Sequence, residues 1–452
     1  MGGFLFGYDW VVIGGAKPFY ERFFQIGNDP NLQGWAMSSA LIGCIGGAMG
    51  AGTFTDRYGR KIALILSALL FLFSAIGTGF SNRLDTFIIF RLLGGLGIGF
   101  ASTVSPMYIS EVSPPAWRGR LVSINQLTIV IGILCAQVMN YLIAEPVPGG
   151  FSDLQILRSW NGQTGWRWMF WAENVPAFVF LISVFFIPES ARWLFKSGKD
   201  AAGLRVLKRL GDEDSAIKEM ENIKATLNVE SRTLPFQELL KPGLRKILIL
   251  GIFLTVFQQW CGINVIFNYA EEIFTSAGFS ISDTLFNIVL TGSVNLIFTF
   301  IAIGMVDKLG RKKLMLTGAL GLGLIYILLG IFYFQHIQGI FVLILVTGAI
   351  AIYAMTLAPV TWVIISEIFP NRIRGIAMSV ATFSLWSACF VLTYTFPWLN
   401  QMLKTAGTFW LYSGICLIGY FLIRTWLPET KGKSLERIEK DIVYSKEIEK
   451  GS

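Results

Sequence analysis

The feature that most constrains this chain is the recurrence of apolar runs, most of them about twenty residues long, which is the length that crosses the hydrocarbon core of a bilayer. A hydrophobic content of 54% with only 15% charged residues fits a membrane protein, because soluble domains do not repeat such runs. We predict an all-α membrane protein with twelve transmembrane helices. The runs lie at 4–15, 34–54, 62–80, 87–107, 121–143, 166–187, 247–269, 286–305, 314–334, 340–365, 375–397 and 408–427.

Three motifs occur once in each half of the chain. Glu-x-x-Pro-x-x-x-Arg-Gly begins at Glu111 and again at Glu367, an offset of 256 (367 minus 111). Asp-[Arg/Lys]-x-Gly-Arg-Lys begins at Asp56 and Asp307, and Pro-Glu follows the sixth and twelfth runs. Such a repeat predicts two pseudo-symmetric six-helix halves, residues 1–187 and 246–430. Between them, 188–245 is a linker with short amphipathic helices at 201–210 and 215–227, and 431–452 is a tail.

The placement of basic residues predicts the orientation in the membrane. We count 30 of the 37 Lys and Arg in alternate loops and the tail, so the positive-inside rule puts both termini in the cytoplasm. Because these residues do not form one patch, the net charge of +8 does not indicate nucleic-acid binding. The opposite side carries only Lys17, Arg22, Arg83, Arg158, Arg167 and Lys404.

Enzymatic and metal chemistry find no support in the residues. The five cysteines all lie inside apolar runs without metal-ligand spacing, and the chain has a single histidine. We see no nucleophile–base pair, metal cluster or phosphate loop. The glycine-rich stretch 94–99 lies within a run, where small residues favour close helix packing. We therefore predict no enzymatic activity and no cofactor.

Three amides interrupt the run 247–269. Gln258, Gln259 and Asn264 would be costly facing lipid, so they should face the bundle interior or a wet cavity. On a helix they would lie within about 120° to 140° of one another around the axis. Gly262 allows the helix to loosen between them. Interhelical hydrogen bonding is the alternative role, since membrane helices often use amides in this way.

Two ionisable residues within the runs predict a buried pair. Asp9 lies in the first run and Arg91 opens the fourth, and either charge would cost at least about 2.5 to 3.5 kcal/mol without a partner. If they pair, protonation of Asp9 would free Arg91 and link a proton to movement of the protein. A static pair near the membrane interface is the alternative.

The repeated charged motifs lie at the loops assigned to the cytoplasm. Opposite charges from different helices can pair across the mouth of the bundle, and several such pairs could close this side in one state and break in another. Orientation signals alone would explain the basic residues but not the repeated acidic ones. The candidate gate residues are Asp56, Arg57, Arg60, Glu111, Arg118, Glu189, Arg192, Asp307, Arg311, Glu367, Arg374 and Glu429.

Seven segments together resemble the sugar porter family of the major facilitator superfamily, over residues 2 to about 437. The pattern is most similar to bacterial proton-coupled xylose and arabinose symporters, and less so to animal glucose facilitators. The resemblance implies a monosaccharide bound at the midplane between two rocking halves, in the inner membrane of a bacterium, by a monomer. The segments are 3–9, 56–61, 91–97, 105–111, 188–194, 258–264 and 428–432.

The same resemblance implies the roles of individual residues. Asp9 and Arg91 match the proton-coupling pair of the symporters; facilitators of the family usually carry Asn at the Asp9 position. The residue types alone leave proton or sodium coupling open. A passive facilitator and a non-transporting sugar sensor are the alternative functions, the sensor being disfavoured by the short tail. The implied sugar-site residues are Phe6, Gln126, Gln258, Gln259, Asn264, Asn295, Trp362 and Trp386, with Asn268 on the pocket wall.

The sequence departs from the symporter pattern in four ways, three of which concern the substrate and one the beginning of the chain. Asn268 stands where a Tyr is expected, Ala358 where a Gly is expected and Leu385 where an amide is expected, so the identity of the sugar does not carry over. Family members also have about a dozen more residues before the first motif. The first run, 4–15, is too short for a core about 30 Å thick. Either the chain as given begins at an internal Met or is trimmed, or, if this is the true start, Asp9 lies nearer to solvent than a coupling role requires.

Overall fold

The computed structural model describes residues 1–114, 117–210, 213–230, 241–370 and 373–431, and this part of the chain is almost entirely helical. Ten of its segments are long and apolar enough to cross a membrane by length and composition. Nine are single spans, and the tenth contains two, because the backbone leaves the helical conformation at Lys404. With the first helix, the described chain has twelve spanning segments, which confirms the predicted fold class.

The helices of the first half form six spans. The sixth begins in a π-helical turn and continues through two helices, earlier than the predicted 166–187. The elements are α1 (Gly2–Phe23), α2 (Pro30–Tyr58), α3 (Arg60–Phe80), α4 (Leu84–Val112), α5 (Arg118–Ile143), α6 (Asp153–Arg158), η1 (Asn161–Gly165), α7 (Trp166–Trp171) and α8 (Asn174–Phe186).

The second half repeats the six spans after the linker helices. Both predicted amphipathic helices are present as α10 and α11. The elements are α9 (Ala191–Lys196), α10 (Asp200–Leu210), α11 (Glu213–Glu230), α12 (Pro242–Trp260), α13 (Ile263–Asn268), α14 (Ala270–Ser276), α15 (Ile281–Leu309), α16 (Arg311–Phe334), α17 (Ile340–Met355), α18 (Leu357–Ile368) and α19 (Arg374–Trp426).

The first span is longer than its apolar run. Helix α1 has 22 residues, about 33 Å at 1.5 Å per residue, so the prediction of a run too short to cross is wrong. The charges that follow the run have partners: the buried Lys17 pairs with Glu21 at 3.0 Å, and Arg22 pairs with the exposed Asp153 at 2.8 Å. The helix therefore continues through them.

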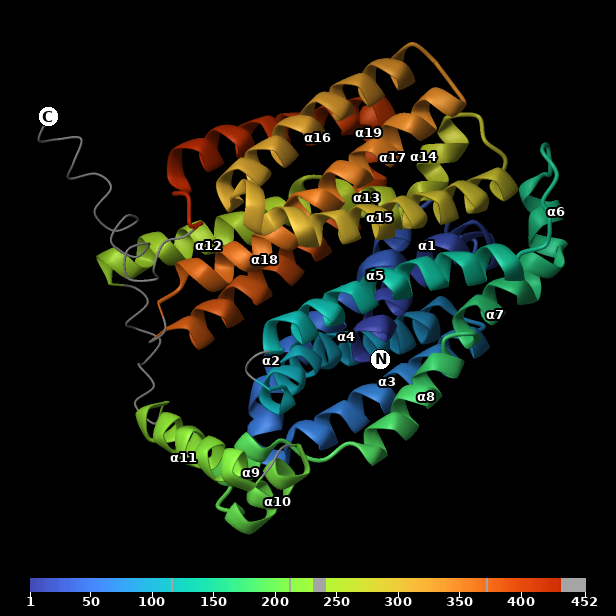
Figure 1. Ribbon diagram of the computed structural model, residues 1–452. Helices are drawn as coiled ribbons and strands as arrows, with labels where there is room; N and C mark the ends of the chain where they lie inside the picture. Colours follow the sequence, from blue (N-terminus) through green and yellow to red (C-terminus); the bar gives the residue numbers. More distant parts are fainter. Residues whose placement is uncertain (115–116, 211–212, 231–240, 371–372, 432–452) are drawn as a thin grey trace, which may run out of the picture.

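The spans form two bundles, α1–α8 and α12–α19, with α9–α11 beside the first bundle (Figure 1). We call the end of the bundles that carries the repeated charged motifs the motif end, and the opposite end the Lys17 end. Small residues allow close crossings, as predicted: a Cβ on Gly95 of α4 would lie 1.8 Å from the Ala40 carbonyl oxygen of α2.

Contacts between the two bundles gather toward the Lys17 end. The rings of Trp35 on α2 and Phe390 on α19 lie 6.4 Å apart, and the Val147 N–H donates to Ser282 Oγ at 2.8 Å. A Cβ on Gly292 of α15 would lie 1.8 Å from Gln137 Oε1 of α5. The two halves are therefore packed together at the Lys17 end in this conformation.

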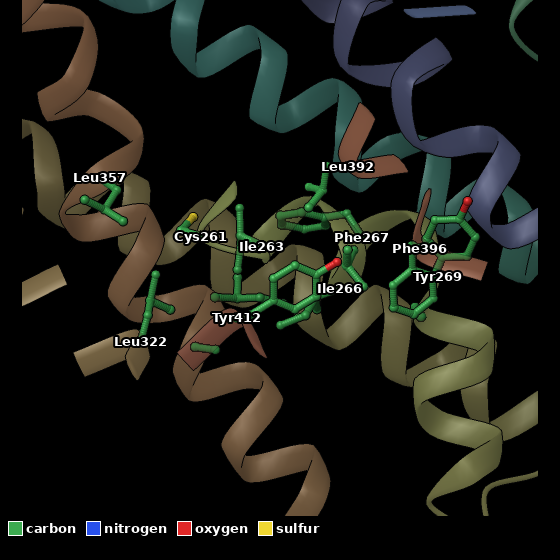
Figure 2. Close-up of a cluster of buried hydrophobic side chains, with 14 of the residues drawn as sticks. Cys261, Ile263, Ile266, Phe267, Tyr269, Leu322, Leu357, Leu392, Phe396 and Tyr412 are labelled. Atoms are coloured by element: carbon green, nitrogen blue, oxygen red, sulfur yellow. The ribbon is translucent and has the colours of Figure 1, made fainter. Parts of the chain in front are cut away.

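Two spans of the second half are broken near their middle. Gly262 has φ +87 and separates α12 from α13, and Thr356 separates α17 from α18. Figure 2 shows how α13 is held: Ile263, Ile266 and Phe267 lie among side chains of other helices, including Leu322 and Tyr412. The loosening predicted at Gly262 is present, and apolar packing fixes the short helix beyond it.

Candidate functional site

The three predicted amides form one hydrogen-bonded chain at the break between α12 and α13. Gln259 Nε2 donates to Gln258 Oε1 at 3.3 Å, and Asn264 Nδ2 donates to Gln259 Oε1. All three side chains are buried. A glycine in the left-handed conformation makes this possible, because it turns α13 back so that Asn264 reaches Gln259.

Both ends of the amide chain are tied to other helices. Gln258 Nε2 lies 3.4 Å from the Ala358 carbonyl oxygen, just past the break between α17 and α18. Asn264 Nδ2 lies 3.5 Å from Cys389 Sγ on α19. The hydrogen-bonded amides therefore connect both broken spans to α19. Cys389 was missed by sequence reasoning, although its position three residues after Trp386 places it one turn along the same helix.

An aromatic cluster lies beside the amides and bridges the two halves. Trp386 of α19 packs against Phe6 of α1, with ring centroids 5.8 Å apart, and against Trp10 at 5.7 Å. Trp10 was not predicted, but it follows Asp9 directly and lies one turn after Phe6. Aromatic faces and amides in one place can hold a ligand with both apolar C–H groups and hydroxyls.

The remaining predicted sugar-site residues differ in exposure. Asn268 at the end of α13 and Asn295 of α15 are buried. Gln126 of α5 is exposed, and Trp362 of α18 is 36% exposed. The structure thus joins Gln258, Gln259 and Asn264 by hydrogen bonds and packs Phe6 against Trp386, one turn from the Cys389 that Asn264 contacts. Their contact with a sugar stays a prediction.

Asp9 and Arg91 form a buried ion pair between α1 and α4. Arg91 Nη1 donates to Asp9 Oδ1 and Nη2 to the Asp9 carbonyl oxygen at 3.3 Å, and the residues are 0% and 2% exposed. The expectation that Asp9 lies near solvent is wrong, because its carboxylate packs between α1 and α4 against Arg91 and Gly94. The second carboxylate oxygen lies against Gly94, where a Cβ would be 2.6 Å away.

A third buried charge at this pair was missed. Glu173, before α8, is 1% exposed and interacts electrostatically with Asp9 and Arg91. Its signal was visible, since it is an acidic residue within the apolar run 166–187. One arginine therefore faces two carboxylates in a site shielded from water.

The charged motifs at the motif end pair within the first half. Arg60 donates to Glu111 through Nε and Nη2, both at 2.9 Å, and lies 3.5 Å from Asp56. Glu189 accepts from the backbone N–H of Arg60 at 3.0 Å and so caps the start of α3, where a negative charge is favoured. Arg57 is exposed and Arg192 half-buried.

The second half repeats this arrangement. Arg311 Nη2 lies 3.1 Å from Glu367 Oε1, and Glu429 accepts from the Arg311 N–H at 2.9 Å at the start of α16. The printed pairs join different helices of the same half, Arg60 with Glu111 and Arg311 with Glu367, and their role as a gate stays a prediction. Three predicted gate side chains lie outside the described residues, namely those of Arg118, Asp307 and Arg374.

Twelve membrane-spanning helices in two repeated halves, with a polar site where the halves meet, define a secondary transporter of the major facilitator type. The model of the family described as "Sugar (and other) transporter" matches residues 1–442. The chain is 39% identical over 441 residues to the arabinose-proton symporter of Bacillus subtilis, covering 97% of this chain and 92% of the relative. The chain therefore belongs to the sugar transporter family, which confirms the resemblance.

Solved structures agree on the fold. The inward-open conformation of the xylose transporter XylE from Escherichia coli matches with a TM-score of 0.84 at 34% identity, covering 97% of both chains. The proton:xylose symporter XylE bound to 6-bromo-6-deoxy-D-glucose matches with a TM-score of 0.75 at 35% identity, covering 97% of this chain and 96% of the other. The present conformation is thus more similar to the inward-open structure than to the sugar-bound one.

Proposed function

We propose that this protein imports a monosaccharide together with a proton by alternating access. The observation that carries the proposal is the position of Asp9. Its carboxylate is buried in the ion pair with Arg91, and the next residue, Trp10, packs on Trp386 of the other half at 5.7 Å. A change in the charge of Asp9 therefore acts one residue away from the aromatic contact that joins the halves.

The sugar is held by the amide chain and the aromatic cluster. Gln258, Gln259 and Asn264 exchange their mutual hydrogen bonds for bonds to vicinal hydroxyls, which need both donors and acceptors. Trp386 and Phe6 cover the apolar face of the ring. Asn268, Asn295, Gln126 and Trp362 complete the walls as the halves move. Both halves of one polypeptide contribute residues to this site, so a monomer suffices for transport.

Protonation supplies the coupling. A neutral Asp9 no longer holds Arg91, and Arg91 turns to Glu173, so the two helices α1 and α4 can shift relative to each other. The motif end faces the cytoplasm, in agreement with its excess of Lys and Arg. The packed Lys17 end and the similarity to an inward-open structure support a cytoplasm-facing conformation.

Uptake into proteoliposomes tests the coupling. With the inside one pH unit more alkaline, no membrane potential and one proton per sugar, labelled sugar should accumulate about tenfold. Asp9→Asn should abolish accumulation and retain sugar exchange between the two sides. Sugar that never exceeds its external concentration in the wild type would refute symport and leave the passive facilitator. Loss of exchange as well would make Asp9 a structural residue.

A competition screen identifies the substrate. Pentoses, hexoses and polyols are tested against one labelled sugar, with wild type and Asn268→Tyr in parallel. We expect Asn268→Tyr to change the order of affinities, because Asn268 lies at the end of the helix that carries Asn264. Binding without any transport in the wild type would favour a sugar sensor over a transporter.

A further inference from the structure

A second cluster of charges lies at the Lys17 end of α1, with Lys17 and Glu21 buried and Glu271 and Glu272 partly buried. Lys17 is 1% exposed and is surrounded by three carboxylates. Its Nζ lies 3.0 Å from Glu21 and 3.6 Å from Glu271, and it donates to Glu272 Oε1. We call these four residues the Lys17 cluster. One positive charge cannot balance three negative ones, so the cluster would carry an excess of two negative charges if every group were ionised.

The Lys17 cluster spans the two halves. Lys17 and Glu21 belong to α1 of the first half, and Glu271 and Glu272 belong to α14 of the second. The ring of Tyr269 lies 5.6 Å from Lys17 Nζ and covers it. Separation of the halves at this end must therefore break the contacts of Lys17 with α14 and expose the carboxylates more fully to water.

Neighbouring groups do not supply the missing positive charge. Gln33 of α2 donates to Glu21 at 3.3 Å, but Glu272 Oε2 is buried without a hydrogen-bond partner. Arg22 interacts electrostatically with Glu21, but its guanidinium pairs with Asp153 at 2.8 Å and so does not neutralise the cluster. Other titratable groups lie near the cluster. Tyr20 of α1 interacts with Lys17, Glu21 and Arg91 of α4, and the ring of Tyr269 covers Lys17. Tyr333 of α16 donates to the Ile273 carbonyl oxygen, and the exposed Asp283 of α15 bonds with Ser280.

We propose that the Lys17 cluster is a second proton-binding site, occupied when the halves are closed at this end and emptied when they separate. The proton resides on Glu272, which shares Lys17 with Glu21 and Glu271. Binding involves no redox step: a proton from water adds to the carboxylate on closing and returns to water on opening. The site is separate from Asp9, Arg91 and Glu173, and it makes closure at the Lys17 end depend on pH.

The direction of this dependence follows from the environment of Glu272. Burial, together with Glu271 and Glu21, raises the pKa of Glu272 from its ordinary value of 4.5 to about 8, against the opposing effect of Lys17. In the separated state its carboxylate meets water and regains an ordinary pKa. The closed state therefore binds the extra proton between pH 4.5 and about 8. In this window the ratio of closed to open molecules falls by about tenfold per unit of rising pH.

Distance measurements between spin labels test the proposal without relying on transport. Labels at Arg83→Cys and Ile340→Cys report the separation of the halves at the Lys17 end, in purified protein without sugar or a pH gradient. We expect the long-distance population to grow from pH 5 to pH 9. Glu272→Gln, which resembles the protonated side chain, should stay closed and lose most of this dependence.

Two matched variants make the outcome specific. Asp283→Asn removes an exposed carboxylate at the same end and should retain the full pH dependence. The dependence should also persist in an Asp9→Asn background, which separates this site from the proposed coupling pair. A wild-type distance distribution that does not change with pH, or a Glu272→Gln variant with the full dependence, overturns the proposal. Failure of sugar accumulation would refute the proposed symport but would not contradict this second proton site.

Discussion

At the scale of single residues, the buried charges are the features that the site most depends on. Arg91 faces Asp9 through two hydrogen bonds and Glu173 through space, so its loss leaves two buried carboxylates without a counter-charge. Loss of Asp9 leaves Arg91 with Glu173. The two substitutions should therefore lower the free energy of unfolding by different amounts, although each removes one partner of the same ion pair.

We expect Arg91→Met to lower the free energy of unfolding by about 3–5 kcal/mol, as is typical when one partner of a buried pair is removed. Asp9→Asn should cost less, and the double variant Asp9→Asn/Arg91→Met should be more stable than Arg91→Met alone. Thermal unfolding in detergent measures all three. A double variant less stable than either single one would contradict this account of the pair.

At the scale of elements, the breaks in the spans decide where polar groups can meet. A continuous helix from 247 to 269 would separate Gln259 and Asn264 around the axis by about 140°. The break at Gly262 instead joins them by a hydrogen bond. The residue at this break must accept φ +87, and a Cβ there would lie 2.8 Å from the ring of Tyr412.

Gly262→Ala should therefore destabilise the protein by about 1–2 kcal/mol from the left-handed backbone alone, and more from the contact with Tyr412. The matched control is Gly414→Ala in α19, where a Cβ would meet nothing within 4 Å. That change should be neutral or stabilising, since alanine favours a helix over glycine by about 1 kcal/mol. Apparent melting temperatures of the two variants check the contrast; equal values would contradict it.

At the scale of the whole molecule, the two halves meet toward the Lys17 end, and the pairs Arg60–Glu111 and Arg311–Glu367 at the motif end each join helices of one half. The Val147 N–H and Ser282 Oγ, 2.8 Å apart, mark one contact between the halves. Alternating access requires this contact to break in every transport cycle. The packing described here is therefore one of at least two arrangements that the proposed function needs.

A disulfide between Val147→Cys and Ser282→Cys should trap the closed Lys17 end. We expect uptake to stop on oxidation and to recover on reduction, because the site can then no longer open to that side. Each single cysteine variant should transport under both conditions, and the native cysteines need no removal if these controls hold. Full uptake by the cross-linked double variant would show that transport does not need this end to open.

The sequence by itself determined the number of spans, the twofold repeat and the candidate site residues, because hydrophobic length and motif spacing are local properties that the bilayer makes obligatory. The predicted length of the first span was too short, because a sequence does not distinguish charges that have partners from charges that face water. Only the tertiary structure decided that Asp9 is buried, that Glu173 joins its pair, and that Lys17 gathers carboxylates from α1 and α14. Those contacts join residues up to 255 positions apart, and only packing brings them together.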